Sequence, residues 1–230
     1  IRDYKVTGVQ TCALPIYRKL DFENMFKVNM DSTYNFKFPG AKVSIEKNSF
    51  YTDKIIQIFE ENNLLHVDKD SIPLLKGITI KMDVSRYNDS IRNRTYIGRI
   101  GENKKSSFVS SKKEENYVIA KVNNLGDFVI KIDSIKPNVS VIDISDNQWI
   151  SNRKNLSIKI SDNESGVKNY RGTINDKWIL LEYNPMKGIL SYDFNDNVNK
   201  DDAKNVLEIK IEDNVGNEKK LIKTFYRKIK

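Results

Sequence analysis

The chain has one cysteine, Cys12, and one histidine, His66. A lone cysteine can form no disulfide within the chain and cannot build a thiolate metal site. A catalytic zinc takes three protein ligands, so a lone histidine supplies one of them at most. Long apolar runs are missing too. No stretch of 18 apolar residues occurs, so no membrane-spanning helix is expected.

Helical periodicity is also missing, because no segment keeps apolar residues at helical spacing over three turns. The chain instead alternates apolar and polar residues in short segments divided by turn residues, which is typical of strands with one buried face. The alternation predicts strands in the first half at residues 26–30, 34–38, 41–46, 54–59, 78–84, 95–100, 117–122 and 128–132, and in the second half at residues 139–144, 156–161, 169–174, 178–183, 189–194, 206–212 and 221–226.

A proline-containing seam, DSIKP at residues 133–137, divides these strands into two groups. Proline has no amide donor and favours extended geometry in the residue before it, so a strand can leave one sheet here and enter another. Many short strands with polar turns indicate sandwiches, and the second group is close to the ~100 residues of an immunoglobulin-like domain. The prediction is an all-β fold of two tandem antiparallel β-sandwich domains, at residues 17–134 and 135–230, the second immunoglobulin-like.

Two turns predict a meander in the second domain. Asn175 and Asp176 tolerate the positive φ of a tight hairpin turn, and residues 184–188 place proline early and glycine late. Residues 178–183 should therefore form one strand that pairs on both sides. This interpretation places Trp178 in the core, where its replacement by alanine would cost ~3–5 kcal/mol. The place of Trp149 stays open between the core and a carbohydrate-stacking surface.

The formal net charge is +8, but the lysines are spread singly between apolar residues. In a strand this spacing puts the charges on the solvated face. Solvated faces are the favoured interpretation, with a weak electrostatic preference for anionic partners that include cell-envelope polymers. No nucleic-acid partner is expected.

Two motifs resemble metal sites without completing one. His66 and Asp70 have the H-x-x-x-D spacing of some zinc peptidases, but no second histidine exists. The DFNDNVN segment at residues 193–199 begins like an EF-hand loop, but Val198 replaces the glycine of its sharp turn and Lys204 replaces the bidentate carboxylate. A surface histidine and a polar loop are the interpretations.

Two further loops repeat each other: LSIKIS runs into DNESG at residues 162–166, and LEIKIE runs into DNVGN at residues 213–217. Aspartate and asparagine bond to their own backbone two residues on, and glycine supplies positive φ, so both loops read as strand-ending turns. Calcium binding by paired aspartates at one end of a sandwich is the open alternative.

Catalytic signatures are absent: there is no glycine-rich phosphate loop, no G-x-S-x-G elbow and no cysteine–histidine pair. The prediction is a chain without enzymatic activity, in which no catalytic, cofactor-binding or metal-binding residue is assigned.

The first residues differ in composition from the rest. Residues 6–16, VTGVQTCALPI, resemble letter for letter the translation of a short-read sequencing adapter, and they lack the apolar core of a signal peptide. Residues 1–16 are therefore interpreted as non-native, and the native polypeptide is expected to begin upstream of Tyr17.

The second half carries a family resemblance. The run SDNESGVKNYRGTINDKWILLEYNPMKGILSYDF at residues 161–194, EDNVGN at residues 212–217 and TFYRK at residues 224–228 resemble the C-terminal immunoglobulin-like domain of lysostaphin/LytM-type zinc metallopeptidases of Bacteroidetes. Residues 38–53 and 124–139 resemble, more loosely, the module before it.

The resemblance implies a function for the parent protein rather than for this chain. It implies an exported murein endopeptidase of the cell envelope, periplasmic or at the surface, whose zinc and catalytic domain lie upstream. The chain would be the non-catalytic accessory region of this enzyme. Its partners would be the upstream catalytic domain in cis and peptidoglycan or another envelope polymer. A cell-surface glycan- or protein-binding adhesion module is the alternative.

Overall fold

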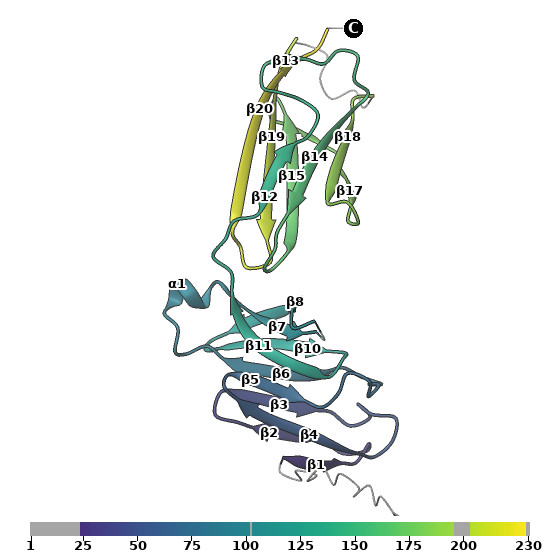
Figure 1. The fold of residues 1–230 in the computed structure, drawn as a ribbon, viewed down its shortest axis with the longest axis vertical. Helices are drawn as coiled ribbons and strands as arrows, with labels where there is room; N and C mark the ends of the chain where they lie inside the picture. Colours follow the sequence, from purple (N-terminus) through teal and green to yellow (C-terminus); the bar gives the residue numbers. More distant parts are fainter. Residues whose placement is uncertain (1–23, 102, 196–202, 229–230) are drawn as a thin grey trace, which may run out of the picture.

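The structure, a computed structural model, describes residues 24–101, 103–195 and 203–228. The adapter-like residues 1–16 lie outside this range. Two all-β domains follow each other along the long axis of the molecule, with the strands of the second domain close to that axis (Figure 1). No helix among the described residues is long and apolar enough to cross a membrane.

The first domain is a sandwich of two antiparallel sheets. One sheet has the strand order β1-β4-β5-β11-β7-β8 and the other β2-β3-β6-β10-β9. A single helical turn, α1 (Asp89–Arg92), lies between β6 and β7. The strands are β1 (Met25–Val28), β2 (Tyr34–Lys37), β3 (Ala41–Ile45), β4 (Lys54–Glu61), β5 (Leu64–Val67), β6 (Ile78–Asp83), β7 (Thr95–Ile100), β8 (Ser106–Val109), β9 (Ser111–Glu114), β10 (Tyr117–Val122) and β11 (Gly126–Ile132).

The second domain is a sandwich of a four-stranded sheet, β12-β14-β18-β17, and a five-stranded sheet, β13-β20-β19-β15-β16. Every pairing is antiparallel except β13 with β20. The strands are β12 (Asn138–Val141), β13 (Gln148–Trp149), β14 (Asn155–Ser161), β15 (Val167–Ile174), β16 (Lys177–Ile179), β17 (Glu182–Asn184), β18 (Ile189–Asp193), β19 (Lys204–Asp213) and β20 (Glu218–Tyr226).

The strand order of the second domain is that of an immunoglobulin fold. Without the short strands β13 and β16, the remaining seven strands can be lettered A to G in chain order. One sheet then has the order A-B-E-D and the other G-F-C, which is the immunoglobulin constant-type arrangement. The predicted fold class, two tandem antiparallel β-sandwiches with the second immunoglobulin-like, is confirmed.

Each domain has its own hydrophobic core. Buried residues of the first domain form one cluster, and those of the second form another. In β6 the inward residues Ile78, Ile80 and Met82 are at most 3% exposed, and the residues between them face outward. The chain passes between the cores through residues 133–137, which contain the boundary predicted at 134/135.

The alternation pattern predicted most strands, but it missed several short ones. Strands β5, β8, β9 and β13 and the turn α1 were not predicted. Strands β8 and β9 contain serine and lysine where an apolar alternation would be needed, so their sequences carry no such signal. The Asn175–Asp176 turn is confirmed, because both residues have positive φ and Ile174 pairs with Lys177 across them.

The prediction of a single strand at residues 178–183 with Trp178 in the core is wrong. The segment divides between two sheets: β16 pairs with β15, and β17 pairs with β18. Ile179 and Leu181 are 1% and 6% exposed and close the edge of the sandwich, while Trp178 is 58% exposed. Since side chains alternate, an inward Ile179 turns Trp178 outward. Gly172 leaves room for the segment that passes from one sheet to the other, because a Cβ at this position would lie 2.7 Å from Leu181 Cδ1.

These neighbouring positions give a matched stability test. We expect Trp178→Ala to change the free energy of unfolding by less than ~0.5 kcal/mol, as at other exposed sites. Ile179→Ala should lower it by about 2–5 kcal/mol, because it leaves a cavity in the core. Urea denaturation of both variants measures the difference, and a larger loss for Trp178→Ala would contradict this burial pattern.

Candidate functional site

A row of lysines crosses the outer face of the β2-β3-β6-β10-β9 sheet. Lys37 lies directly opposite Lys42, and Lys42 lies directly opposite Lys81. Lys81 is opposite Ile119, which is itself opposite Lys112. Directly opposed residues in antiparallel strands lie on the same face of the sheet, with neighbouring strands ~4.8 Å apart. We call Lys37, Lys42, Lys81 and Lys112 the lysine row.

The lysine row places like charges side by side. Directly opposed like charges destabilise a sheet by a fraction of a kcal/mol per pair. Lys112 forms an ion pair with Glu114, and the Lys42 ammonium lies 4.3 Å from the centre of the Tyr117 ring. Lys37, Lys42 and Lys81 form no ion pair with a described residue. The face therefore carries positive charge that its own carboxylates leave largely uncompensated.

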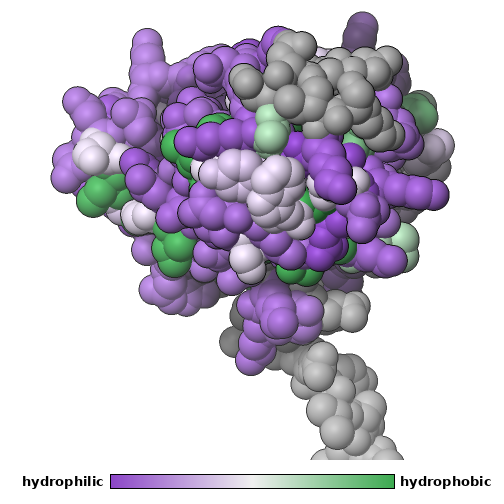
Figure 2. Space-filling view, turned by 90° about the horizontal axis from the view of Figure 1, so that it is seen from above, coloured by the Kyte–Doolittle hydropathy of each residue, from purple (hydrophilic) through white to green (hydrophobic). Residues whose placement is uncertain are grey.

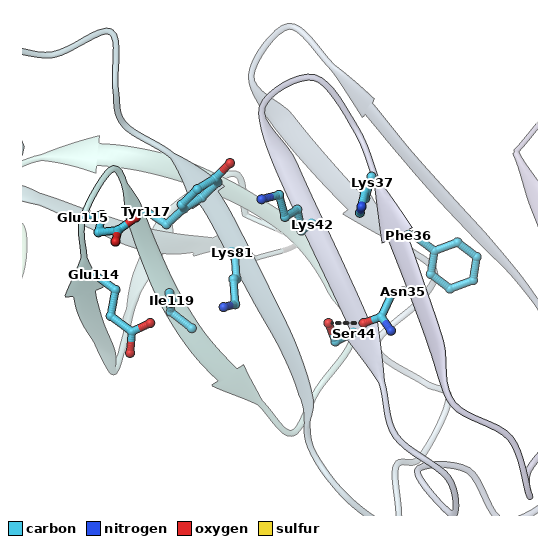
Figure 3. Close-up of a pocket in the computed structure, with 10 residues that line it drawn as sticks. All are labelled: Asn35, Phe36, Lys37, Lys42, Ser44, Lys81, Glu114, Glu115, Tyr117 and Ile119. Carbon is cyan, nitrogen blue, oxygen red and sulfur yellow. Dashed lines mark hydrogen bonds between the residues drawn. The ribbon is translucent and has the colours of Figure 1, made fainter.

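Three members of the lysine row, Lys37, Lys42 and Lys81, line an open groove of about 750 Å³ (Figure 3). Polar side chains lie beside the row, including Ser44, which donates a 2.7 Å hydrogen bond to Asn35. At the other side, the hydrogen bond and charge of Lys112 lower the pKa of Glu114. The sequence predicted solvated lysines, but it did not predict their alignment, because alignment depends on the register between strands.

A second group of charged side chains lies where the two domains meet. One carboxylate oxygen from each of Asp133, Asp162 and Asp213 lies within 4.8 Å of the others. Among the described residues, this is the only group of three histidine, cysteine or acidic side chains arranged in this way. Asp133 and Asp213 are 0% exposed, and Asp162 is partly exposed. We call these three residues the carboxylate cluster.

Side-chain alternation brings two of these aspartates together. In β19, Leu207, Ile209 and Ile211 point inward and are 0% exposed, and Asp213 follows in the same inward series. In β14, Leu156, Ile158 and Ile160 point inward, and Asp162 is next in that series after the strand ends. The two strands belong to facing sheets, so both carboxylates lie between the sheets at the same end.

The loops hold Asp162 and Asp213 in similar ways. Asp162 Oδ1 accepts hydrogen bonds from the backbone N–H groups of Glu164 and Gly166, at 3.1 and 2.7 Å. Asp213 Oδ1 accepts them from Val215 and Asn217, at 3.0 and 2.7 Å. The glycines of both loops have positive φ. The predicted turn chemistry of the two loops is confirmed.

Asp133 reaches the carboxylate cluster from the first domain. It follows β11 directly, and its Oδ2 accepts hydrogen bonds from the Ser165 hydroxyl and backbone N–H, at 2.6 and 3.1 Å. Its Oδ1 accepts one from the Ile135 N–H at 3.0 Å. The sequence identified Asp133 only as part of the seam, because nothing in a linear pattern shows which loop a linking residue will meet.

Asn217 lies against the carboxylate cluster and is 1% exposed. Its Nδ2 donates to Asp213 Oδ2 at 2.6 Å and to the Asp133 carbonyl oxygen at 3.1 Å. Its side-chain oxygen, Oδ1, is buried and has no hydrogen-bond partner. Buried polar atoms are almost always satisfied, so this oxygen needs an explanation.

The surroundings of the carboxylate cluster contain a further carboxylate, Glu164, and nearby basic residues. The Tyr96 hydroxyl donates to Glu164 across the junction at 3.2 Å, and burial and the charge of Glu164 raise the pKa of this hydroxyl. Burial raises the pKa of Asp162, against the lowering effect of the Gly166 N–H. Burial and the charge of Arg94 lower the pKa of Lys113, while the charge of Asp213 acts to raise it. No described lysine or arginine forms an ion pair with the cluster.

His66 and Asp70, which have the spacing of a zinc motif, do not come together in the described part of the chain. His66 Nδ1 lies 2.6 Å from Asp127 Oδ1, whereas Asp70 accepts a hydrogen bond from Arg99. His66 and Asp70 therefore contact different partners, despite their H-x-x-x-D spacing. Asp193 Oδ1 accepts the Asn195 N–H, and the rest of the EF-hand-like segment, residues 196–199, lies outside the described residues.

The aromatic residues of the second domain divide between core and surface. Tyr192 and Phe225 are buried, whereas Trp149, whose place the sequence left open, is 60% exposed and stacks on Tyr226 with ring centres 5.3 Å apart. The face shown in Figure 2 has hydrophobic residues scattered among hydrophilic ones rather than one continuous apolar patch. Scattered apolar residues are normal on protein surfaces.

Comparisons with known proteins find similarity to a domain family and to solved structures. Residues 24–133, which form the first domain, are similar to the family of Zu5-like domains. Among solved structures, the fibronectin(III)-like modules of Clostridium thermocellum CbhA match with 11% identity and a TM-score of 0.32, over 66% of this chain and 86% of that one. No curated protein matches the chain.

Protonation of Asp162 should affect stability. Because its pKa is raised in the folded state, its stabilising contribution is present at low pH and declines as pH rises through the folded-state pKa. In a metal chelator, we expect Asp162→Asn to raise the melting temperature at pH 7 relative to the native chain, with a smaller difference near pH 4. Thermal denaturation across this pH range measures it, with Asp193→Asn as the control. Equal pH dependence of the native chain and Asp162→Asn would contradict the expectation.

Proposed function

We propose that the chain is a non-catalytic accessory region of an exported, peptidoglycan-cleaving zinc metallopeptidase of the cell envelope, and that it contacts the envelope polymer through the lysine row. The lysine row is the observation that carries this proposal. Its opposed like charges reduce sheet stability, and an anionic ligand would relieve that repulsion. The accessory role is supported by the resemblance of residues 161–194 and 212–217 to such enzymes.

A carboxylate-bearing glycan polymer fits the chemistry of this face. The groove is open, so a long polymer can cross it without entering a closed pocket. Lysines spaced by the strand separation can contact several carboxylates of such a polymer. Ser44 and Thr79, which are opposed to each other beside the row, add hydroxyl groups that can hydrogen-bond to sugars.

A glycan- or protein-binding adhesion module is the second candidate. The exposed Trp149–Tyr226 stack favours it, because paired aromatic faces can bind sugar rings or side chains. The Trp149–Tyr226 stack would bind a neutral ligand, whereas the lysine row would bind an anionic one.

Retention on purified peptidoglycan sacculi tests the lysine row. We expect the double variant Lys42→Glu, Lys81→Glu to bind at least about tenfold more weakly and with less dependence on salt. Lys219→Glu is the control, since it changes one exposed lysine of the second domain. Equal retention of the double variant, or stronger retention of the native chain on neutral polysaccharide or on DNA than on sacculi, would contradict the proposal.

The parent protein can be tested separately from the binding surface. Recovery of the intact gene should show an upstream domain with both H-x-x-x-D and H-x-H zinc motifs in the same reading frame. An upstream sequence that lacks either motif would refute the peptidase parent and leave the binding surface to be judged by the sacculus experiment.

A further inference from the structure

We propose that the carboxylate cluster and Asn217 form a calcium site that fixes the link between the two domains. Three carboxylates that approach within 4.8 Å, two of them fully buried, repel one another strongly if they are ionised. Buried charges in proteins are paired with an opposite charge or coordinate a metal. No described lysine or arginine forms an ion pair with the cluster, and Lys113 acts on Asp213 only from beyond ion-pair distance, so a bound cation would supply the balancing charge.

The Asn217 amide is a second observation: its Nδ2 faces Asp213 and the Asp133 carbonyl, and its Oδ1 is buried without a partner. The two polar atoms of an amide group are ~2.2 Å apart, so Oδ1 lies within about 5 Å of the Asp213 carboxylate that Nδ2 contacts. A half-turn of this amide would exchange the two atoms and bring Oδ1 to face both Asp213 and the Asp133 carbonyl. Without a cation these oxygens would repel each other, whereas with one they would all be ligands.

The donor set selects calcium among the common metals. Every candidate ligand is an oxygen: three carboxylates, the amide of Asn217 and the backbone carbonyl of Asp133. Calcium takes six to eight oxygen ligands of these kinds with flexible geometry. Magnesium prefers one or two carboxylates with several retained waters, and zinc prefers nitrogen and sulfur. Partly exposed Asp162 leaves a side from which the ion and its waters can enter.

Calcium would join parts of the chain that belong to different domains. Asp133 follows the last strand of the first domain, whereas in the second domain Asp162 directly follows β14 and Asp213 ends β19. In Figure 1 the β14–β15 and β19–β20 loops are at the end of the second domain that faces the first. An ion bound by all three would hold the link at one end of residues 133–137.

Calorimetric titration of the chelator-stripped full chain with calcium chloride is the first test. We expect one saturable site per chain, with weaker binding of magnesium. Asp162→Asn should abolish this binding and, because Asp162 is partly exposed, should leave the fold intact. Asp193→Asn is the matched control, since Asp193 also accepts a backbone N–H, from Asn195, but lies outside the cluster. Absence of saturable binding, or unchanged binding by Asp162→Asn, would overturn the proposal.

Two further measurements locate the ion. Asn217→Ala keeps all three carboxylates and should weaken calcium binding, so unchanged affinity would remove Asn217 from the site. Calcium should also reverse the order of stability: Asp162→Asn melts above the native chain in chelator and below it in calcium. Failure of the order to reverse would contradict a role of the ion in stability.

Hydrogen exchange tests the effect on the link. We expect calcium to slow exchange of the Ile135 and Ser165 amides, which donate to Asp133, in the native chain but not in Asp162→Asn. The Asn195 amide, which donates to Asp193, should be unaffected. Slowing at Asn195 alone would place the ion elsewhere and refute a calcium-fixed link.

Discussion

Burial of every second side chain between facing sheets is the constraint on which both sites depend. The same period of two that places Ile80 and Met82 in the core turns Lys81 outward, and cross-strand register then sets Lys81 beside Lys42. The period also acts at the strand ends. Where the inward series of β14 and β19 continues past the last aliphatic residue, it places an aspartate between the sheets. One rule thus gives positive charge on an outer face and negative charge at an inner end.

The two groups of charges differ in how strongly their surroundings act on them. Two unit charges 4 Å apart interact by ~1 kcal/mol in water and by ~4 kcal/mol at the effective dielectric constant of a protein near its surface. The lysine row is solvated, so its repulsion is small and easily screened by salt. Asp133 and Asp213 are 0% exposed, so the repulsion within the carboxylate cluster is the larger effect. Relief of the repulsion within the carboxylate cluster requires protons or a cation. The repulsion within the lysine row is weak enough for the sheet to form without a ligand.

The sequence predicted the fold because the fold is a matter of local alternation and turn chemistry. Strands such as β6 and β19 alternate over their whole length, and the Asn175–Asp176 turn needs only residues that accept positive φ. The misassignment of Trp178 shows the limit of this reasoning, because a segment with apolar residues at both parities can place either set inward. The sites were harder still. The lysine row needs the register of five strands, and the carboxylate cluster needs the contact between Asp133 and a loop 32 residues later.

Polar contacts join the two domains, whose hydrophobic clusters are separate. Each domain encloses its own hydrophobic cluster, and the clusters share no residue. Interfaces between domains of one chain are commonly small and polar, and relative motion is then expected. The contacts across this junction include Tyr96 with Glu164, Asp133 with Ser165 and Asn217 with the Asp133 carbonyl. All of them surround the carboxylate cluster, so whatever balances its charge also determines how firmly the lysine row is held relative to the second domain.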